Sequence, residues 1–337
     1  MTSIEDSGPS ENLALTAGKS AWLNNIIACS LSIFLNAVAT WVLICSKNIP
    51  SLLKVVVLIL KLLEMSFSGL FIAACPIFAA VTYDGFSALM IVNAGVEFDV
   101  HVSYWFLMHS LVLLTQQIFT SPITYFIRYL QICRKGVHLP QVLFIFIVNI
   151  VLLILSVGFL CYASMPTTDD LILLSSMAVS YVGHQTAFLV LSYDKSVTML
   201  PVLVSGITYC FILLFSIVVM LFCYSQINAT AKSSPNMSEN LIKLQKRSNV
   251  ILMTQFLITI IFIQVPFFYS VLGPLVGVSQ GLATYLVSIL FVWGPVANAL
   301  MLYIFKTEVR RMVFRCAKDA DLNVIAVGEN RSTLKLI

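Results

Sequence analysis

Seven apolar runs, each about long enough to cross a lipid bilayer as a helix, divide this chain. A bilayer core of ~30 Å needs about 20 helical residues, and each run meets that length. In hydrocarbon every backbone N–H and C=O must be satisfied within its own segment, so we expect the runs to be α-helices. The runs are Trp22–Cys45, Val55–Val81, His101–Ile127, Gln141–Ser164, Pro201–Tyr224, Asn249–Leu272 and Leu282–Phe305. The pattern predicts an all-α, integral membrane seven-transmembrane helix bundle.

The connections between the runs carry very unequal numbers of Lys and Arg. One side has two, Lys19 and Lys195, and Lys61 lies inside a run. The other side has sixteen: Lys47, Lys54, Arg128, Arg134, Lys135, Lys232, Lys243, Lys246, Arg247, Lys306, Arg310, Arg311, Arg315, Lys318, Arg331 and Lys335. Because cytoplasmic loops are enriched in Lys and Arg, the chain is expected to keep its N-terminus outside and its C-terminus in the cytoplasm.

Composition supports a membrane protein. The chain is 59% hydrophobic and 10% charged, whereas a soluble domain carries about 25% charged residues. The cytoplasmic basic residues are explained by topology and by lipid headgroups. We therefore expect a multi-pass protein of the plasma membrane with the lipid bilayer as a partner, and no nucleic acid.

Two segments flank the apolar part, residues 22–305. Residues 1–21 are polar and acidic, and we expect a disordered extracellular N-terminus. Residues 306–337 form a cytoplasmic tail, in which Lys306–Arg315 would make a short amphipathic helix along the inner leaflet. Cys316 follows that helix and is a candidate for palmitoylation; an unmodified cysteine is the alternative.

The stretch Leu171–Tyr193 is apolar enough to suggest an eighth span. Gly183, His184 and Gln185 break it, and the cleaner run Leu171–Val182 is too short to cross a bilayer. We interpret it as a long outer loop that packs back over the bundle.

The eight cysteines show no CxxC spacing, so no zinc or redox motif is present. Only Cys75 and Cys161 approach the predicted outer face. They are expected to be two buried thiols, with a disulfide between them as the alternative.

Charged residues inside the spans invite functional hypotheses, because burying them in hydrocarbon is expensive. Lys61 and Glu64 stand three positions apart on one face of the second span. They could pair in a structural polar network with Asn36 of the first span. Alternatively, Glu64 could bind a cation or proton coupled to activation, or Lys61 could extend toward the cytoplasm without touching Glu64.

Other polar residues and several prolines interrupt the apolar runs. Gln116, Gln117, Gln255 and Gln264 are expected to form hydrogen bonds across helices. His101 and His109 stand in the outer part of the third span, without partners at metal-ligand spacing. Pro76, Pro122, Pro266 and Pro295 are expected to bend helices.

No sequence motif of an enzyme is present. The chain lacks Gly-x-Ser-x-Gly, His-Glu-x-x-His and paired intramembrane aspartates. We expect neither catalysis nor a bound cofactor or metal.

Specific residues resemble G-protein-coupled receptors. Leu60-Lys61-Leu62-Leu63-Glu64 is similar to the Leu-Ala-x-x-Asp of rhodopsin-like receptors. The resemblance to the nematode serpentine chemoreceptor superfamily of the Str, Srh and Srd type is closer, and covers about Leu23 to Arg315. It rests on Phe126-Ile127-Arg128-Tyr129, on Leu244-Gln245-Lys246-Arg247 with Gln255, Pro266 and Pro274, and on Gly294-Pro295-Val296 before Arg310-Arg311.

Some receptor features are missing. The cysteine pair of the usual receptor disulfide is absent, as are Asn-Pro in the seventh span and Cys-Trp-x-Pro in the sixth. The activation switches of rhodopsin-like receptors therefore transfer only weakly to this chain.

The resemblance implies a chemosensory receptor that binds a small, odorant-like ligand in the outer half of the bundle and signals to a heterotrimeric G protein. It also implies a sensory cilium as the location. Arg128, Tyr129, Lys246 and Arg247 would contact the G protein; for Arg128 an ordinary basic residue at a helix end is the alternative. Helix rise from Arg128 and the positions of Pro266 and Pro295 indicate which residues lie in the outer half of the bundle. The nine candidate ligand residues there are Leu107, Ser110, Leu114, Phe267, Phe268, Val271, Thr284, Tyr285 and Ser288. A membrane transporter or a ligand-gated channel remains the alternative function.

Overall fold

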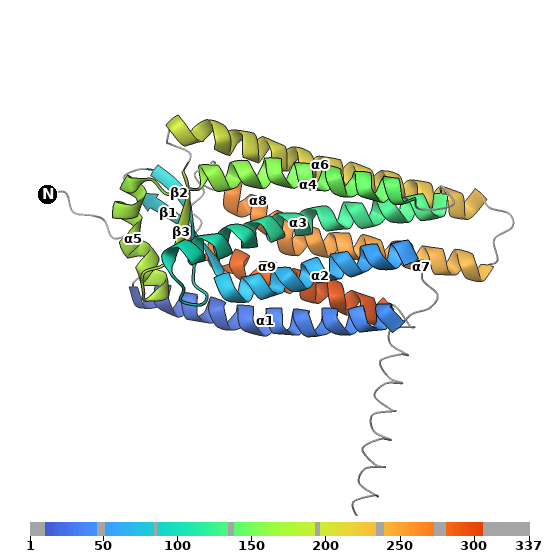
Figure 1. Ribbon diagram of the computed structural model, residues 1–337, viewed down its shortest axis with the longest axis horizontal. Coiled ribbons are helices and arrows are strands. Elements are labelled where there is room, and N and C mark those ends of the chain that lie inside the picture. Colours follow the sequence, from blue (N-terminus) through green and yellow to red (C-terminus); the bar gives the residue numbers. More distant parts are fainter. Residues whose placement is uncertain are drawn as a thin grey trace, which may run out of the picture.

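Long helices form a bundle that is closed at one end by a small sheet and a short helix (Figure 1). The computed structural model describes residues 11–45, 51–83, 86–133, 138–192, 196–233, 239–272 and 281–305. The long helices are α1 (Glu11–Cys45), α2 (Ser51–Ala74), α3 (Val100–Cys133), α4 (Leu139–Ala163), α6 (Ser196–Ser233), α7 (Glu239–Thr259) and α9 (Gly281–Phe305). Helix α7 continues through a π-helical segment, η1 (Ile260–Gln264), into α8 (Val265–Leu272).

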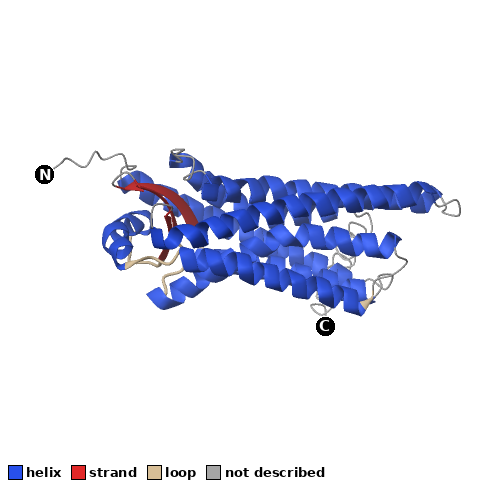
Figure 2. Ribbon diagram, turned by 90° about the horizontal axis from the view of Figure 1, so that it is seen from above, coloured by secondary structure: helices blue, strands red, loops and turns tan. Residues whose placement is uncertain are grey.

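The other elements lie together at one end of the bundle. They are the short helix α5 (Thr168–Val182) and the strands β1 (Pro76–Tyr83), β2 (Phe86–Asn93) and β3 (Phe188–Ser192). We call this end the sheet end, and we call the opposite end, where α3 ends at Cys133 and α7 begins at Glu239, the distal end (Figures 1 and 2).

Five helical segments in the described part of the chain are long and apolar enough to cross a membrane. These are Gly18–Cys45, Lys54–Ala74, Leu139–Ala163, Gly206–Thr230 and Asn249–Ser270. Leu286–Met301 of α9 is a shorter apolar helix. The exposed faces of α4 and α6 are covered by large apolar side chains such as Phe144, Ile154, Phe211 and Val218. Such faces are suited to lipid contact.

The described part of the chain is mostly helical, as predicted, but three strands depart from the predicted all-α fold. They form an antiparallel sheet in the order β1-β2-β3, with Phe78 opposite Ile91 and Ile91 opposite Leu189. Strand residues alternate between the two faces of a sheet. Here one face packs into the bundle core, whereas Ala79, Met90 and Val190 pack against α5. Because both faces are buried, the strands are mostly apolar, and their sequence does not show the polar alternation of a surface strand.

The second predicted span, Val55–Val81, is too long. Helix α2 ends at Ala74, and Cys75 adopts a φ of 38°, in the left-handed region that helices cannot continue through. Pro76 therefore begins β1 and does not kink a helix. The expected prolines inside helices are found at Pro122 in α3 and Pro295 in α9, and Pro266 stands near the start of α8.

The chain after β2 completes the end of α2. The last carbonyls of a helix have no partner within the helix. Those of Ala73, Ala74 and Cys75 accept hydrogen bonds from the backbone N–H groups of Val96, Gly95 and Ala94, at 2.9, 3.1 and 3.3 Å. A Cβ on Gly95 would lie 1.9 Å from the Ala73 oxygen, so this close approach requires glycine.

Two further predictions concern the sheet end. The segment Leu171–Tyr193 contains α5 and β3, which cover the bundle, so it is not an eighth spanning helix. Helix α1 begins at Glu11, so the stretch from there to Ala21 is helical and not disordered as expected.

Residues 306–337, with the predicted amphipathic helix and Cys316, lie outside the described residues.

Candidate functional site

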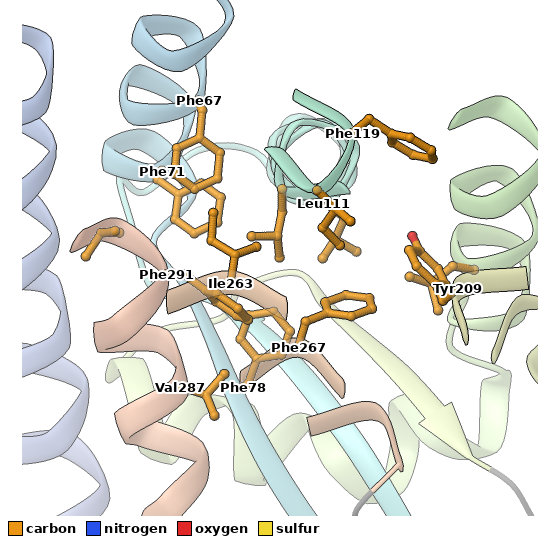
Figure 3. Close-up of a cluster of buried hydrophobic side chains, with 14 of the residues drawn as sticks. Phe67, Phe71, Phe78, Leu111, Phe119, Tyr209, Ile263, Phe267, Val287 and Phe291 are labelled. Atoms are coloured by element: carbon orange, nitrogen blue, oxygen red, sulfur yellow. The ribbon is translucent and has the colours of Figure 1, made fainter. Parts of the chain in front are cut away.

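A large apolar cluster fills the bundle directly beneath the sheet (Figure 3). It gathers Leu111 from α3, Phe267 from α8, Phe291 from α9 and Phe78 from β1. The Phe78 and Phe291 rings meet edge to face at 5.2 Å between centroids. Strand β1 therefore extends the core of the bundle and couples the sheet to α9.

Most of the predicted ligand residues lie in or beside this cluster. Leu107, Ser110 and Leu114 line the inner face of α3, and each is 0% exposed. Phe267 and Ser288 are buried, and Phe268 is half-buried against the cluster. Val271, Thr284 and Tyr285 lie on α8 and α9, but their side chains are outside the described part of the structure.

The serine hydroxyls of this region already have partners. Ser110 Oγ donates to the Leu107 carbonyl at 2.7 Å, and Ser288 Oγ accepts the backbone N–H of Phe78 at 3.0 Å. Ser110 thus satisfies itself within its helix, whereas Ser288 ties α9 to β1.

Tyr209 of α6 is a core residue that the sequence analysis missed. The Thr115 hydroxyl donates to the Leu111 carbonyl at 2.9 Å, and its oxygen accepts from the Tyr209 hydroxyl at 2.8 Å. The Tyr209 ring packs on Phe267, with centroids 4.9 Å apart. A buried tyrosine usually needs a polar partner. Nothing in the sequence indicates that Thr115, on a different helix, is the partner of Tyr209.

Gln264, at the end of η1, lacks the cross-helix hydrogen bond that its sequence position predicted. Its side chain is 1% exposed, and neither its amide nitrogen nor its amide oxygen has a partner among the described residues. The π-helical turn is closed by the Val265 N–H, which donates to the Ile260 carbonyl. The neighbouring Ile263 packs against Gly294, where an added Cβ would lie 3.1 Å from its Cδ1.

Gln116 does form a cross-helix hydrogen bond. Its Oε1 accepts from Asn149 Nδ2 of α4 at 2.9 Å, and both residues are buried. This pair joins α3 to α4, most of whose exposed residues are apolar. His109, in contrast, is exposed, with its Nδ1 2.8 Å from the Trp105 carbonyl oxygen.

The structure brings Asn36, Lys61 and Glu64 together between α1 and α2. Lys61 Nζ lies 2.6 Å from Glu64 Oε2 and donates to Asn36 Oδ1 at 3.1 Å. The contact rules out the alternative in which Lys61 avoids Glu64. Asn36 donates to Ser32 Oγ at 3.3 Å, and Ser68 Oγ donates to Ser32 Oγ at 2.8 Å. The two serines stand four residues from Asn36 and Glu64, a helical spacing that could have indicated them.

The ends of three helices are tied together at the distal end. The Tyr125 hydroxyl of α3 donates to the Asn249 carbonyl of α7 at 3.5 Å, and Asn249 Nδ2 donates to Asn228 Oδ1 of α6 at 3.1 Å. Tyr129 packs on Phe222 of α6, with ring centroids 5.7 Å apart.

The predicted basic coupling residues lie on the same helices. Arg128 stands on the last turns of α3, and Lys246 and Arg247 stand on α7, but their side chains are outside the described part of the structure.

Cys75 and Cys161 are both free thiols. Cys75 is 0% exposed, and its sulfur accepts a hydrogen bond from Asn25 Nδ2 at 3.0 Å. Burial raises the pKa of the Cys75 thiol to about 12, although the hydrogen bond from Asn25 opposes the rise. The thiol is therefore protonated and unreactive at neutral pH.

Comparison with known proteins adds one finding. No curated protein sequence matches the chain. The family described as serpentine type 7TM GPCR chemoreceptor Str matches residues 23–314, which is most of the chain and includes every described element from α2 onward. The chain therefore belongs to the Str family of serpentine seven-transmembrane chemoreceptors, which confirms the resemblance seen in its motifs.

Proposed function

We propose that this chemoreceptor binds a small, mainly apolar ligand beneath its sheet and signals to a heterotrimeric G protein from its distal end. In this proposal the sheet end faces outward and seven helical segments cross the plasma membrane. The observation that carries the proposal is the family match over residues 23–314.

The distribution of basic residues supports the orientation. Lys232 at the end of α6, Lys243 on α7 and Lys54 on α2 all lie toward the distal end, whereas Lys19 lies near the sheet end. Basic residues favour the cytoplasmic side, so the distal end would face the cytoplasm.

The cluster beneath the sheet supports the ligand site. Its walls come from elements far apart in the sequence, namely α3 through Leu114, α6 through Tyr209, and α8 through Phe267. A ligand between these walls would change the spacing of three helices at once. Mostly apolar walls with few free polar groups suit a small hydrophobic molecule.

Two continuous rods connect the ligand region to the distal end. Helix α3 carries Leu114 near the sheet and Tyr125 at the distal end, and the α7–η1–α8 rod carries Phe267 and Asn249 in the same way. A ligand that binds better when these rods are apart shifts the population toward that arrangement. The hydrogen bonds that connect Tyr125, Asn249 and Asn228 would then break.

The opened distal end would receive the G protein. Arg128, Tyr129, Lys246 and Arg247 stand on the two helices that separate there. A guanidinium can donate several hydrogen bonds in a fixed fork to backbone carbonyls, which suits Arg128 for contact with an inserted peptide segment. Palmitoylation of Cys316 would further hold the tail at the membrane.

The ion pair between Lys61 and Glu64 has a structural role in this proposal. The two charges neutralise each other, and Asn36, Ser32 and Ser68 connect the pair to α1. The network would hold α1 against α2 while the other helices move.

The test is a G-protein dissociation assay in cells that express the receptor and are challenged with volatile and water-soluble odorants. Membrane current and substrate uptake are recorded in the same cells. A receptor gives a ligand-dependent G-protein signal without current or uptake, whereas a current or uptake without that signal refutes the proposal and identifies a channel or a transporter.

A further inference from the structure

Gln264 stands out among the buried amide side chains of the described residues. Other buried amides, such as those of Gln116 and Asn149, have one unpaired atom and one that forms a hydrogen bond. Gln264 has both its donor and its acceptor unpaired, at 1% exposure. Leaving a buried polar group unpaired is destabilising, so native proteins rarely keep one without a reason.

The position of Gln264 connects it to the candidate ligand site. It ends η1, and π-helical turns are frequent at functional sites. Phe267 and Phe268 follow at the i+3 and i+4 positions, which share a helix face with Gln264. Phe267 packs on Tyr209 in the cluster beneath the sheet, at 4.9 Å between ring centroids. The unpaired amide therefore lies one helical turn below the apolar walls.

The charges inside the bundle restrict the ligand further. The buried charged side chains of the described part are Lys61, Glu64 and Asp170. Lys61 and Glu64 neutralise each other at 2.6 Å, and the Asp170 carboxylate accepts both the N–H and the hydroxyl of Thr167 at 2.8 Å in the capping box of α5. Each of these charged groups already has an ion-pair or hydrogen-bond partner. Burying a further charge without a partner would be very costly.

We propose that Gln264 is the polar contact of the ligand site, and that the ligand is a neutral, mainly apolar molecule with one group that both donates and accepts a hydrogen bond. A hydroxyl or a carboxamide meets this requirement, because each can pair with the amide oxygen and the amide nitrogen of Gln264. An ether offers only an acceptor, and an alkylammonium brings a charge. The inference rests on the proposed function, since it assumes a ligand beneath the sheet.

The first measurement needs no ligand. In Gln264→Met an apolar side chain of similar length replaces the unpaired amide in purified receptor in lipid nanodiscs. Removal of an unpaired polar group is expected to raise the melting temperature by about 2–4 °C. Gln255→Met, a half-buried glutamine on the same rod, is the control and is expected to change it little. A lower melting temperature in Gln264→Met would mean that the amide has a structural partner, which overturns the assignment.

The second measurement uses hexanol, hexanamide, pentyl methyl ether and hexylamine as probes of matched size. Hexanol and hexanamide are expected to raise the melting temperature of the wild type and of Gln255→Met more than the ether and the amine do. In Gln264→Met this extra rise in melting temperature is expected to disappear. General effects of the probes on the lipid remain in all three proteins.

The proposal is contradicted if hexanol and hexanamide still raise the melting temperature of Gln264→Met more than the ether and the amine do. It is also contradicted if hexylamine gives the largest rise. Because the assay contains no G protein, it tests the ligand contact of Gln264 separately from the proposed receptor function. Loss of the hexanol shift in Gln264→Met without any G-protein activation by hexanol in cells would uphold the binding residue and reject the receptor function.

Discussion

At the scale of single residues, buried polar groups differ in whether they have hydrogen-bond partners, and the proposed roles rest on that difference. Lys61, Glu64 and Asn36 form a closed network inside the apolar bundle. Gln264 is left unpaired beneath the sheet. The first arrangement suits a rigid contact between α1 and α2. The second suits a side chain that forms hydrogen bonds with a ligand.

The ion pair leads to a stability prediction. Lys61→Met leaves Glu64 buried without its partner, and removal of one member of a buried pair costs about 3–5 kcal/mol. We expect a clear loss of thermal stability in the purified receptor. The double variant Lys61→Met with Glu64→Gln removes both charges and should recover much of that loss. If the single variant is as stable as the wild type, Lys61 does not neutralise Glu64.

At the scale of elements, the apolar runs predicted the helices better than they predicted where the helices end. The runs Gln141–Ser164 and Leu282–Phe305 nearly coincide with α4 and α9. Residues Pro76–Val81 were assigned to a span because a strand buried on both faces is as apolar as a membrane helix. The π-helical turn at Ile260–Gln264 has no sequence signature, since its extra residue is visible only in the hydrogen bonds.

The candidate site shows the same limit. Helix rise from Arg128 predicted the depth of Leu107 and Leu114 in the bundle, and the position after Pro266 predicted that of Phe267. The partners of Tyr209 and Ser288 come from α3 and β1. Those pairings depend on how separate elements pack, which a single sequence does not reveal.

The end of α2 gives an element-scale prediction. An added Cβ at Gly95 would meet the backbone of Ala73, which cannot move aside like a flexible side chain. We expect Gly95→Ala to lower the unfolding free energy by about 1–3 kcal/mol, as overpacking does. Gly158→Ala on α4 is the matched control, because a Cβ there meets nothing within 4 Å. Thermal unfolding of both variants measures the difference, and equal stability would show that α2 and the chain after β2 are not in close contact.

At the scale of the whole molecule, the bundle has two unlike ends. The sheet end is closed by β1–β3 and α5, and the distal end is held by side-chain contacts among α3, α6 and α7. In our proposal the closed, layered end shields the ligand site, and the end held by a few hydrogen bonds opens.

The orientation can be measured directly. An epitope tag at the N-terminus should bind antibody on intact cells, whereas a tag at the C-terminus should bind only after the membrane is made permeable. This follows from the excess of Lys and Arg toward the distal end. The reverse pattern would place the sheet in the cytoplasm and would reject the proposed ligand site.

The central claim is that a ligand at the sheet end activates a G protein through the distal end. Its most direct test is ligand-dependent G-protein dissociation in cells that express wild type, Arg128→Ala or Lys19→Ala at equal surface levels. Lys19→Ala removes a positive charge at the opposite end and serves as the control. We expect a signal from wild type and Lys19→Ala, and at least a tenfold loss in Arg128→Ala, about 1.4 kcal/mol of coupling free energy. A normal signal from Arg128→Ala, or none from the wild type, would contradict the account.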